Sequence, residues 1–480
     1  MPEAATATLT EPTVPARPPR QVYAVAAVAA LGGLLFGYDT GIISGALLHL
    51  RDDLGLSSRG QEIVVSVILV GAMVGALCSG RLAARHGRRR VVLWVAVVFA
   101  AGAAAAAVAP GTGTLIAARF VLGLAVGGAS NMVPVYIAEV APPAIRGRLM
   151  VLFQLMVAIG QLISFFCGWL LADTGGWRLM FGLATVPAAV LALGIVRLPE
   201  SPRWLVEQGR RDEARRVLRG LRSPGTDVDA EITAIGEVSS APSRDGWRAV
   251  RRPWVRPALL IAVGVAAFSQ LTGINAVVYY APAILSDAGF GTSVALLTGI
   301  GIGAMLVVAG IVGAVALDAV GRRRTMLWFL PLSGLSMAVL ALAFLAGDSP
   351  VQRWVVILSL FAYILFNGIG MQSVVWVIAP EILPLGVRGP ATSLATVSVW
   401  GFDLLIAVTA LTAINTIGRS GTFFVYAAMN VLCVVFVALK VPETRNRSLE
   451  EIERAHRLPP VGDLPSSAQS TASKSGSPQA

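Results

Sequence analysis

Charged side chains are scarce in this 480-residue chain, where Asp, Glu, Lys and Arg together make up 14% of the residues. Soluble domains carry about 25%. Hydrophobic residues make up 55%, and the mean hydropathy is +0.73. Such a composition excludes a single soluble core, because it provides too few polar side chains to cover one. The apolar runs approach the ~20 residues with which a helix crosses a bilayer. The sequence therefore predicts an all-α integral membrane protein.

Cysteine and histidine are also rare, with three residues of each. Cys78, Cys167 and Cys433 lie in apolar segments and show no disulfide or metal-binding spacing, so we expect buried free thiols. The chain has no phosphate-binding Gly-Lys-Ser/Thr loop, and no Ser/His/Asp or metal-ligand arrangement stands out. The sequence therefore indicates neither an enzyme nor a protein with a cofactor or a metal.

The chain has a net charge of +11, and its positive charges are concentrated in particular loops. Arginines cluster in the loops that follow even-numbered apolar spans, as at Arg88 to Arg90 and Arg322 to Arg324, whereas the loop Pro110–Gly113 has none. By the positive-inside rule, both termini are expected in the cytoplasm. We therefore interpret the charge as a sign of membrane topology and expect no binding of nucleic acid.

Twelve transmembrane spans can be placed on the chain, and they divide into two sets of six. The predicted organisation is a disordered cytoplasmic tail (1–20), an N-terminal six-helix half (21–198), a cytoplasmic linker with short amphipathic helices such as Glu207–Leu221 (199–255), a C-terminal six-helix half (256–442) and a cytoplasmic C-terminal tail (443–480).

Three segments of the first half recur in the second. His86-Gly-Arg-Arg-Arg90 matches Val320-Gly-Arg-Arg-Arg324, Ala138-Glu-Val-Ala-Pro-Pro-Ala-Ile-Arg146 matches Pro380-Glu-Ile-Leu-Pro-Leu-Gly-Val-Arg388, and Pro199-Glu200 matches Pro442-Glu443. The copies are about 240 residues apart in each case, which indicates two six-helix repeats of one design. In transporters built from such repeats, the substrate site lies near the midplane between the halves.

An isolated carboxylate, Asp39, lies within the first apolar span. A charge at membrane depth costs roughly 3 kcal/mol or more, so it usually faces a cavity, a partner charge or a proton path. Arg119, near the start of the fourth span, is a candidate partner. Protonation of the acid would free the arginine and change the preferred conformation. The alternative is a static salt bridge that only packs the helices.

Five motifs in order give the chain its resemblance to a known family: Gly37-Tyr-Asp-Thr-Gly41, Pro134-Val-Tyr-Ile-Ala-Glu139, Pro199-Glu-Ser-Pro-Arg-Trp204, Gly273-Ile-Asn-Ala-Val-Val-Tyr-Tyr280 and Pro442-Glu-Thr-Arg445. From about residue 30 to 455, the chain resembles the sugar porters of the major facilitator superfamily. The resemblance implies the major facilitator fold, with twelve helices in two six-helix halves. It also implies that the pair Asp39 and Arg119 carries proton coupling.

The resemblance also implies a substrate site. Recognition of a polyol needs amides that donate and accept hydrogen bonds, and an aromatic face against the ring. The candidates are Phe36, Gln154, Gln270, Asn275, Gln372 and Trp376, with Asn367 less certain. Tyr279 and Tyr280 resemble the outer-gate tyrosines of the family. For each polar residue, packing between helices is the alternative role.

Charged residues recur at the cytoplasmic ends of the spans and are candidates for an inner gate: Arg88, Glu139, Arg146, Glu200, Arg203, Arg322, Glu381, Arg388, Glu443 and Arg445. We expect ion pairs between the halves, which would hold this gate shut while the cavity opens outward. A solvated charged rim is the alternative. Ala84 and Ala319 replace an acid and an arginine of the family motif, so the predicted latch is incomplete in both halves.

Several positions depart from the family pattern. Leu306 and Asp403 stand where the pattern has asparagines, and the Gly-Pro-x-Pro-Trp run of span ten is Gln372-Ser-Val-Val-Trp376. Asp403 is a second acid within a span, and no arginine is near it in sequence. It could bind a proton, contact an amine of the substrate, or cap a broken helix.

The function predicted from these features is proton-coupled symport of a sugar or polyol, such as a hexose, a pentose or inositol, by alternating access. The partners are the solute, the proton and the lipid bilayer, and we expect a monomer in the cell (plasma) membrane. Facilitated diffusion of a sugar, or transport of a non-sugar organic solute, is the alternative. A sensor that binds sugar without carrying it is disfavoured, because the tails are short and featureless.

Overall fold

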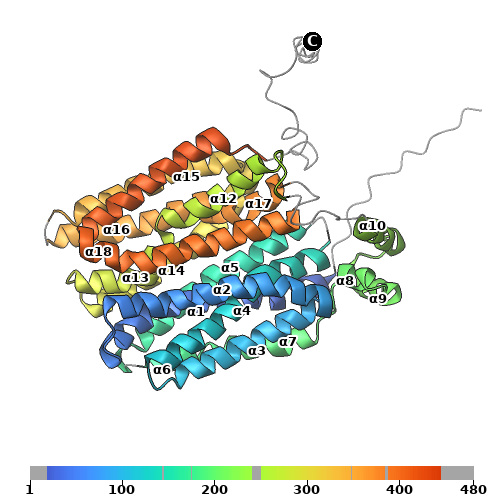
Figure 1. The fold of residues 1–480 in the computed structure, drawn as a ribbon, viewed down its shortest axis with the longest axis horizontal. Helices are drawn as coiled ribbons and strands as arrows, with labels where there is room; N and C mark the ends of the chain where they lie inside the picture. Colours follow the sequence, from blue (N-terminus) through green and yellow to red (C-terminus); the bar gives the residue numbers. More distant parts are fainter. Residues whose placement is uncertain are drawn as a thin grey trace, which may run out of the picture.

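The computed structural model of the protein describes residues 19–142, 145–174, 176–240, 250–346, 349–383 and 388–444. Nearly all of these residues are helical. The tails predicted to be disordered lie largely outside the described residues, as do Arg445, residues 241–249 of the linker and the side chain of Arg388. Figure 1 shows the two halves as neighbouring layers of long helices, with the linker helices at one end of the bundle.

The N-terminal half consists of long apolar helices and two short ones: α1 (Arg20–Asp53), α2 (Ser58–His86), α3 (Arg88–Ala107), α4 (Thr112–Val140), α5 (Arg146–Leu170), α6 (Trp177–Gly182) and α7 (Thr185–Val196). Local signals fix the ends of α2. Ser57 caps its N-terminus by accepting a hydrogen bond from the Gly60 amide at 3.2 Å, and Gly87 ends it with a φ of 94°, which is a conformation that favours glycine.

The C-terminal half repeats this plan with more interruptions: α12 (Arg256–Leu271), α13 (Ile274–Asp287), α14 (Thr292–Ala319), α15 (Arg322–Ala343), α16 (Pro350–Asn367), the π-helix η2 (Gly368–Gln372), α17 (Ser373–Ile382) and α18 (Arg388–Lys440). Within the described residues, eleven helical stretches are long and apolar enough to cross a membrane. The last of them contains two spans, because Gly418 breaks α18 with φ 77° and ψ 165°. The predicted fold of twelve helices in two halves is thus confirmed.

The seventh span is not one continuous helix. It ends as α12 at Leu271 and resumes as α13 at Ile274. Gly273 adopts a φ of 94°, and the ring of Tyr426 packs against the space that a side chain would need. The carbonyl group of Thr272, exposed by the break, accepts hydrogen bonds from the Tyr363 hydroxyl at 2.8 Å and the Asn430 amide at 3.3 Å. The carbonyl group that the break exposes therefore has hydrogen-bond donors inside the bundle.

The linker folds into three short helices, α8 (Pro202–Glu207), α9 (Arg211–Leu221) and α10 (Val228–Ser240). The predicted helix over Glu207–Leu221 begins later, at Arg211, because Gly209 (φ 75°) separates α8 from α9. Arg222 joins the linker to the N-terminal half: it donates to the Val140 carbonyl at 2.9 Å and pairs with Glu231 at 2.7 Å.

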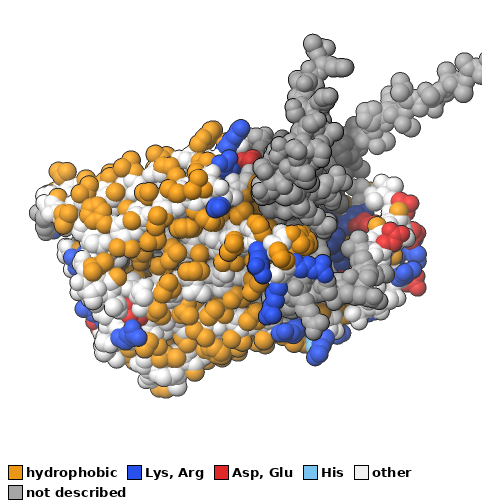
Figure 2. All heavy atoms as spheres, turned by 45° about the horizontal axis from the view of Figure 1, so that its top comes forward, with side chains coloured by type: hydrophobic (Ala, Val, Ile, Leu, Met, Phe, Trp, Pro, Cys, Tyr) orange, Lys and Arg blue, Asp and Glu red, His pale blue; other side chains and the backbone are white. Residues whose placement is uncertain are grey.

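The outer surface of the bundle is apolar around its length. Figure 2 shows hydrophobic side chains over one face, bounded on the side of the linker helices by basic side chains, nearly all of which are arginines. Many of these exposed side chains are large, including Leu179, Trp328 and Leu439. The surface also corrects one prediction: Cys433 is buried, but Cys78 is exposed and Cys167 is half-buried, although all three are free. A thiol in an apolar span can face lipid, because a span needs only an apolar surface there.

Candidate functional site

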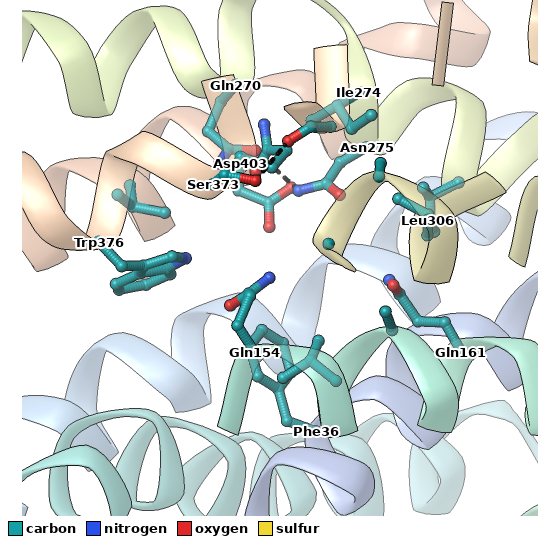
Figure 3. Close-up of a pocket in the computed structure, with 18 of the residues that line it drawn as sticks. Phe36, Gln154, Gln161, Gln270, Ile274, Asn275, Leu306, Ser373, Trp376 and Asp403 are labelled. Atoms are coloured by element: carbon teal, nitrogen blue, oxygen red, sulfur yellow. Dashed lines mark hydrogen bonds between the residues drawn. The ribbon is translucent and has the colours of Figure 1, made fainter. Parts of the chain in front are cut away.

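A cavity with about 770 Å³ of empty space, part of it open to solvent, lies between the two halves. Helices α1 and α5 supply one wall, and α12, α13, α14, η2, α17 and α18 supply the other. In Figure 3, Phe36, Gln154 and Gln161 face Gln270, Asn275 and Asp403 across it. The lining includes five amide side chains, Trp376 and Trp400, and the described residues contribute no arginine, lysine or histidine to it.

The amides of the C-terminal wall are joined by hydrogen bonds. Asn275 donates to Gln270 at 2.7 Å, and Gln372 donates to the Ser269 carbonyl at 3.1 Å. The break between α12 and α13 places Gln270 and Asn275 on its two sides, so both reach the cavity. Amides held this way present both donors and acceptors, as the hydroxyl groups of a polyol require.

The structure brings all six predicted substrate residues to this cavity: Phe36, Gln154, Gln270, Asn275, Gln372 and Trp376. Asn367 is not among the lining residues. It is fully buried, and its amide group donates to Thr272 at 3.2 Å and to Ser333 at 3.4 Å. Its contacts join α16 to α12 and α15, which is the packing role that the sequence left open.

Among the lining residues that were not predicted, Gln161 has an amide side chain and Trp400 an aromatic one. Gln161 follows Gln154 by two helical turns on α5, and its amide donates to Thr40 at 3.3 Å. The spacing of seven residues places both on one helix face, a signal available in the sequence. Trp400 packs on Phe36 across the halves with ring centroids 5.4 Å apart, a contact that no spacing predicts.

Asp39 and Arg119 meet inside the N-terminal half. The side chain of each is 1% exposed, and Arg119 Nη2 lies 3.7 Å from Asp39 Oδ2. Arg119 Nε donates to the Val64 carbonyl at 2.8 Å, and its guanidinium lies over the Phe181 ring. Asp39 Oδ2 and Arg119 Nη1 have no hydrogen-bond partner within the described part of the chain. The ion pair is therefore buried but only loosely joined.

Asp403 lies in the cavity wall on α18 and is 2% exposed. The Tyr279 hydroxyl donates to Asp403 Oδ2 at 3.0 Å. The neighbouring hydroxyl of Tyr280 donates to the Ala407 carbonyl at 2.7 Å. Both predicted outer-gate tyrosines are thus buried and bound to α18 of their own half.

Contacts between the halves gather at the end of the bundle away from the linker helices. Arg51 pairs with Asp287 at 2.9 Å, and Asn415 donates to Ser58 at 3.2 Å. Glu62, a residue not singled out from the sequence, is buried on α2 and accepts hydrogen bonds from the Thr412 amide and hydroxyl of α18 at 2.8 and 2.9 Å. The bundle is therefore closed at this end. The helix dipole stabilises acids in the first turns of a helix. The position of Glu62 in the sequence is therefore explained without a partner in the other half, and it does not predict this contact.

At the linker end, the N-terminal half contains a network of charges around Gly87. Arg88 pairs with Glu139 on α4 at 2.9 Å, and Ser201 donates a short hydrogen bond to Glu139. Glu200 accepts hydrogen bonds from the backbone amides of Arg88 and Arg89 at 2.8 and 3.0 Å. A Cβ atom at Gly87 would collide with the Glu200 carboxylate.

The C-terminal half repeats the network. Arg322 pairs with Glu381 at 2.8 Å, and Thr444 donates to Glu381 at 2.6 Å. Glu443 accepts hydrogen bonds from the backbone amides of Arg322 and Arg324 at 2.9 and 3.3 Å, beside Gly321 with a φ of 104°. Arg88, Glu139, Glu200 and Ser201 of the first network correspond to Arg322, Glu381, Glu443 and Thr444 of the second, as expected of repeated halves.

The described members of the predicted inner gate do not pair between the halves in this conformation, and the side chains of Arg388 and Arg445 lie outside the described residues. Each ion pair of the two networks joins helices within one half or connects that half to the linker. Arg203 is exposed, and the half-buried Arg146 lies near the like charges of Arg203 and Arg222. The physical reason is that glycine turns and helix N-termini offer local partners to these carboxylates, so they need none across the halves.

Comparison with known proteins places the chain in a family. The family described as "Sugar (and other) transporter" matches residues 25–456. A D-xylose transporter of Levilactobacillus brevis is 40% identical over 431 residues, covering 89% of this chain and 94% of its own length. The galactose-proton symporter of Escherichia coli (strain K12) is 37% identical over 431 residues, covering 89% and 92%.

A solved structure is also similar: the xylose transporter XylE from E. coli in a partially occluded inward open conformation. It superposes with a TM-score of 0.77 and 28% sequence identity, covering 89% of this chain and 100% of that one. The chain belongs to the sugar transporter family of the major facilitator superfamily, and it is a multi-pass membrane transporter.

Proposed function

We propose that the protein is a symporter that takes up a sugar or polyol together with a proton. The observation that carries this proposal is the combination of an amide-lined cavity between two repeats with the buried pair of Asp39 and Arg119. The amides fit neutral hydroxyl groups, and the carboxylate supplies a group that can take up a proton inside the membrane. Relatives named for xylose and for galactose with a proton support the same solute class.

The proposed setting is the plasma membrane, with both termini and the linker in the cytoplasm. Arginines border the apolar surface at the linker end, in agreement with the positive-inside rule. Both walls of the cavity come from one chain, so a monomer has a complete site. Closure at the opposite end by Glu62, Thr412 and their neighbours then corresponds to an inward-facing conformation.

The transport cycle follows from this geometry. In the outward-facing conformation, Asp39 takes up a proton and the solute binds between the amides of the two halves. Neutralisation of Asp39 releases Arg119 from a buried ion pair, so the halves can rock to the conformation closed at Glu62. Solute and proton then leave toward the linker end, and the empty carrier returns.

Uptake by proteoliposomes tests the proposal against facilitated diffusion and against a non-sugar solute. D-xylose, D-galactose and myo-inositol are supplied with and without an inward proton gradient. We expect accumulation of at least one of them above its external concentration only with the gradient. If the solute only equilibrates across the membrane, with or without the proton gradient, the protein is a facilitator. Uptake of none of the three solutes would indicate another solute class.

Removal of the Gln270 amide should weaken solute binding. Gln270→Ala loses a cavity donor and leaves Asn275 without its 2.7 Å partner, which costs about 1–2 kcal/mol, or about tenfold in Kd. Quenching of the cavity tryptophans measures the affinity. Gln352→Ala is the matched control, because this amide bonds the Ala343 carbonyl outside the cavity. Equal affinity of the Gln270→Ala and wild-type proteins would show that Gln270 does not contribute to solute binding.

Weakening the contact of Glu62 should open the bundle at its closed end. Glu62→Gln removes the charge that strengthens both bonds to Thr412, so we expect the outward-facing population to rise about tenfold. Leu296, which packs near Gly45 across the halves, is replaced by cysteine in a background without native cysteines. An impermeant thiol reagent then reports opening. Asp52→Asn, an exposed acid at the same end, should leave labelling unchanged, and slow labelling of the Glu62→Gln protein would contradict the role.

A further inference from the structure

Asp403 presents an unpaired carboxylate oxygen in a cavity to which the described part of the chain contributes no cationic side chain. Its Oδ2 accepts the Tyr279 hydroxyl, whereas Oδ1 is buried and has no hydrogen-bond partner within the described residues. The side chain is 2% exposed overall and belongs to the lining of the cavity. The cavity wall therefore holds a buried hydrogen-bond acceptor without a donor. The transport cycle described above assigns no role to Asp403.

The charged and titratable groups on neighbouring helices do not neutralise Asp403. Tyr279 and Tyr280 of α13 donate neutral hydroxyls to α18. On α2, the carboxylate of Glu62 is bound to Thr412. Arg119 of α4 contacts Asp39 of α1 and the backbone of α2.

Within the described residues, the remaining helices against α18 supply no cation that is paired with Asp403. The charged side chains of α15 and α17 nearest the cavity, Arg322 and Glu381, pair with each other at the linker end. The polar groups that α12 contributes near the site are the neutral Ser269 and Gln270. An ionised Asp403 would therefore be a buried charge without a counterion, which is strongly unfavourable.

A proton resolves this electrostatic problem and also suits a polyol. A protonated carboxyl group offers one O–H donor and one carbonyl acceptor, much like the asparagine amide that the family pattern has here. An ionised carboxylate offers acceptors only. An amino group on the solute is the other source of positive charge, but the rest of the lining consists of neutral amides that suit hydroxyl groups equally well.

Asp403 also lies at the depth of the known buried acid. The rings of Phe36 and Trp400 contact each other across the halves. Both α1 and this part of α18 run away from the linker end, and each acid follows its ring by three residues, or about 4.5 Å of helix rise. The two carboxylates are thus placed at one level, Asp39 inside the N-terminal half and Asp403 at the cavity.

We propose that Asp403 is a second proton-binding residue, and that its protonated form contacts the transported solute and holds it. The proposal rests on the proposed function. The proton enters from the outer medium before the solute binds. After the halves rock, the solute leaves to the cytoplasm and the empty carrier returns with Asp403 still protonated, so only the proton of Asp39 makes a net crossing with each solute. Asp39 governs which loaded states can rock, whereas Asp403 governs affinity.

The test is the affinity of purified protein for D-xylose, D-galactose and myo-inositol, measured by tryptophan quenching across pH without a gradient. For the wild type, we expect affinity to fall about tenfold per pH unit once Asp403 ionises. Asp403→Asn imitates the protonated form, so its affinity should stay high and independent of pH. Asp403→Ala lacks both donor and acceptor, so its affinity should be independent of pH and about tenfold weaker than that of Asp403→Asn.

Two controls separate Asp403 from other acids. Asp173→Asn changes an exposed acid outside the cavity, and its affinity should depend on pH as in the wild type. Asp39→Asn should also keep the pH dependence of affinity, although it loses coupled uptake. Elution as a single monodisperse species on size exclusion, together with the Asp403→Ala comparison, distinguishes a lost contact from a misfolded protein.

Two results would overturn the proposal. In the first, Asp403→Asn retains the wild-type pH dependence, which would make Asp403 a packing residue. In the second, D-galactosamine binds more tightly than D-galactose at neutral pH and Asp403→Asn removes that preference, which would assign the carboxylate to a substrate amine. Failure of the wild type to take up any of the sugars would instead contradict the proposed function, and with it this inference.

Discussion

Proteoliposomes that contain the Asp39→Asn protein should lose accumulation of solute and keep exchange across the membrane. With one proton per solute, an inward gradient of one pH unit supports about tenfold accumulation in the wild type. Asparagine imitates a permanently protonated Asp39, so Arg119 is never held in the buried pair seen at 3.7 Å. The carrier can then rock with or without a proton, and accumulation falls to the external concentration. Uptake against a gradient and counterflow of labelled solute measure the two activities.

Asp173→Asn is the matched control for the change from acid to amide, since Asp173 is exposed and lies outside the cavity. It should accumulate solute as the wild type does. Full accumulation by the Asp39→Asn protein would show that the pair of Asp39 and Arg119 only packs α1 against α4.

Locking the closed end should stop transport. Ser58 and Asn415 are hydrogen-bonded across the halves at 3.2 Å, so a cysteine pair at these positions can form a disulfide in the observed conformation. Alternating access requires this end to open, and we therefore expect oxidation to reduce uptake by about a hundredfold, as binding from outside is prevented. Reduction should restore it. Radiolabelled uptake before and after each treatment measures the effect.

Each single cysteine variant is the control for that experiment, in a background where Cys78, Cys167 and Cys433 are replaced. Neither single variant should respond to oxidation. Undiminished uptake by a fully cross-linked protein would mean that the halves do not separate at this end.

Most of the fold and much of the site could be predicted from the internal repeats and the residue types of the sequence. Apolar length and the positions of arginine predict twelve spans in two halves, and the structure has them. The six predicted substrate residues meet in one cavity because they lie on helices that surround the interface of the halves. Their identities reflect a need for amides and aromatic rings that is visible in the sequence.

Other features depend on contacts that a single sequence does not encode locally. The break of span seven needs Gly273, but it also needs Tyr363 and Asn430 to satisfy the exposed carbonyl group. The charges at the linker end find partners inside each half because the φ angles at Gly87 and Gly321 aim backbone amides at Glu200 and Glu443. Glu62 contacts a residue 350 positions away, so its role became visible only in the folded chain.

Two departures from the family pattern, Leu306 and Asp403, lie in the lining of the cavity. Leu306 lines the cavity beside the amides and makes part of its wall apolar. Asp403 replaces an amide at the same cavity and brings a second acid into contact with the solute space. These positions are where the solute preference of this protein should differ from that of its relatives.

The central claim is that solute and proton cross together, and the movement of protons on addition of solute tests it most directly. Proteoliposomes with a pH-sensitive dye inside are prepared without any gradient, and D-xylose, D-galactose or myo-inositol is added outside. The account predicts acidification of the interior that depends on a transported solute and is absent for the Asp39→Asn protein. Solute entry at the wild-type rate with no change in internal pH would contradict it.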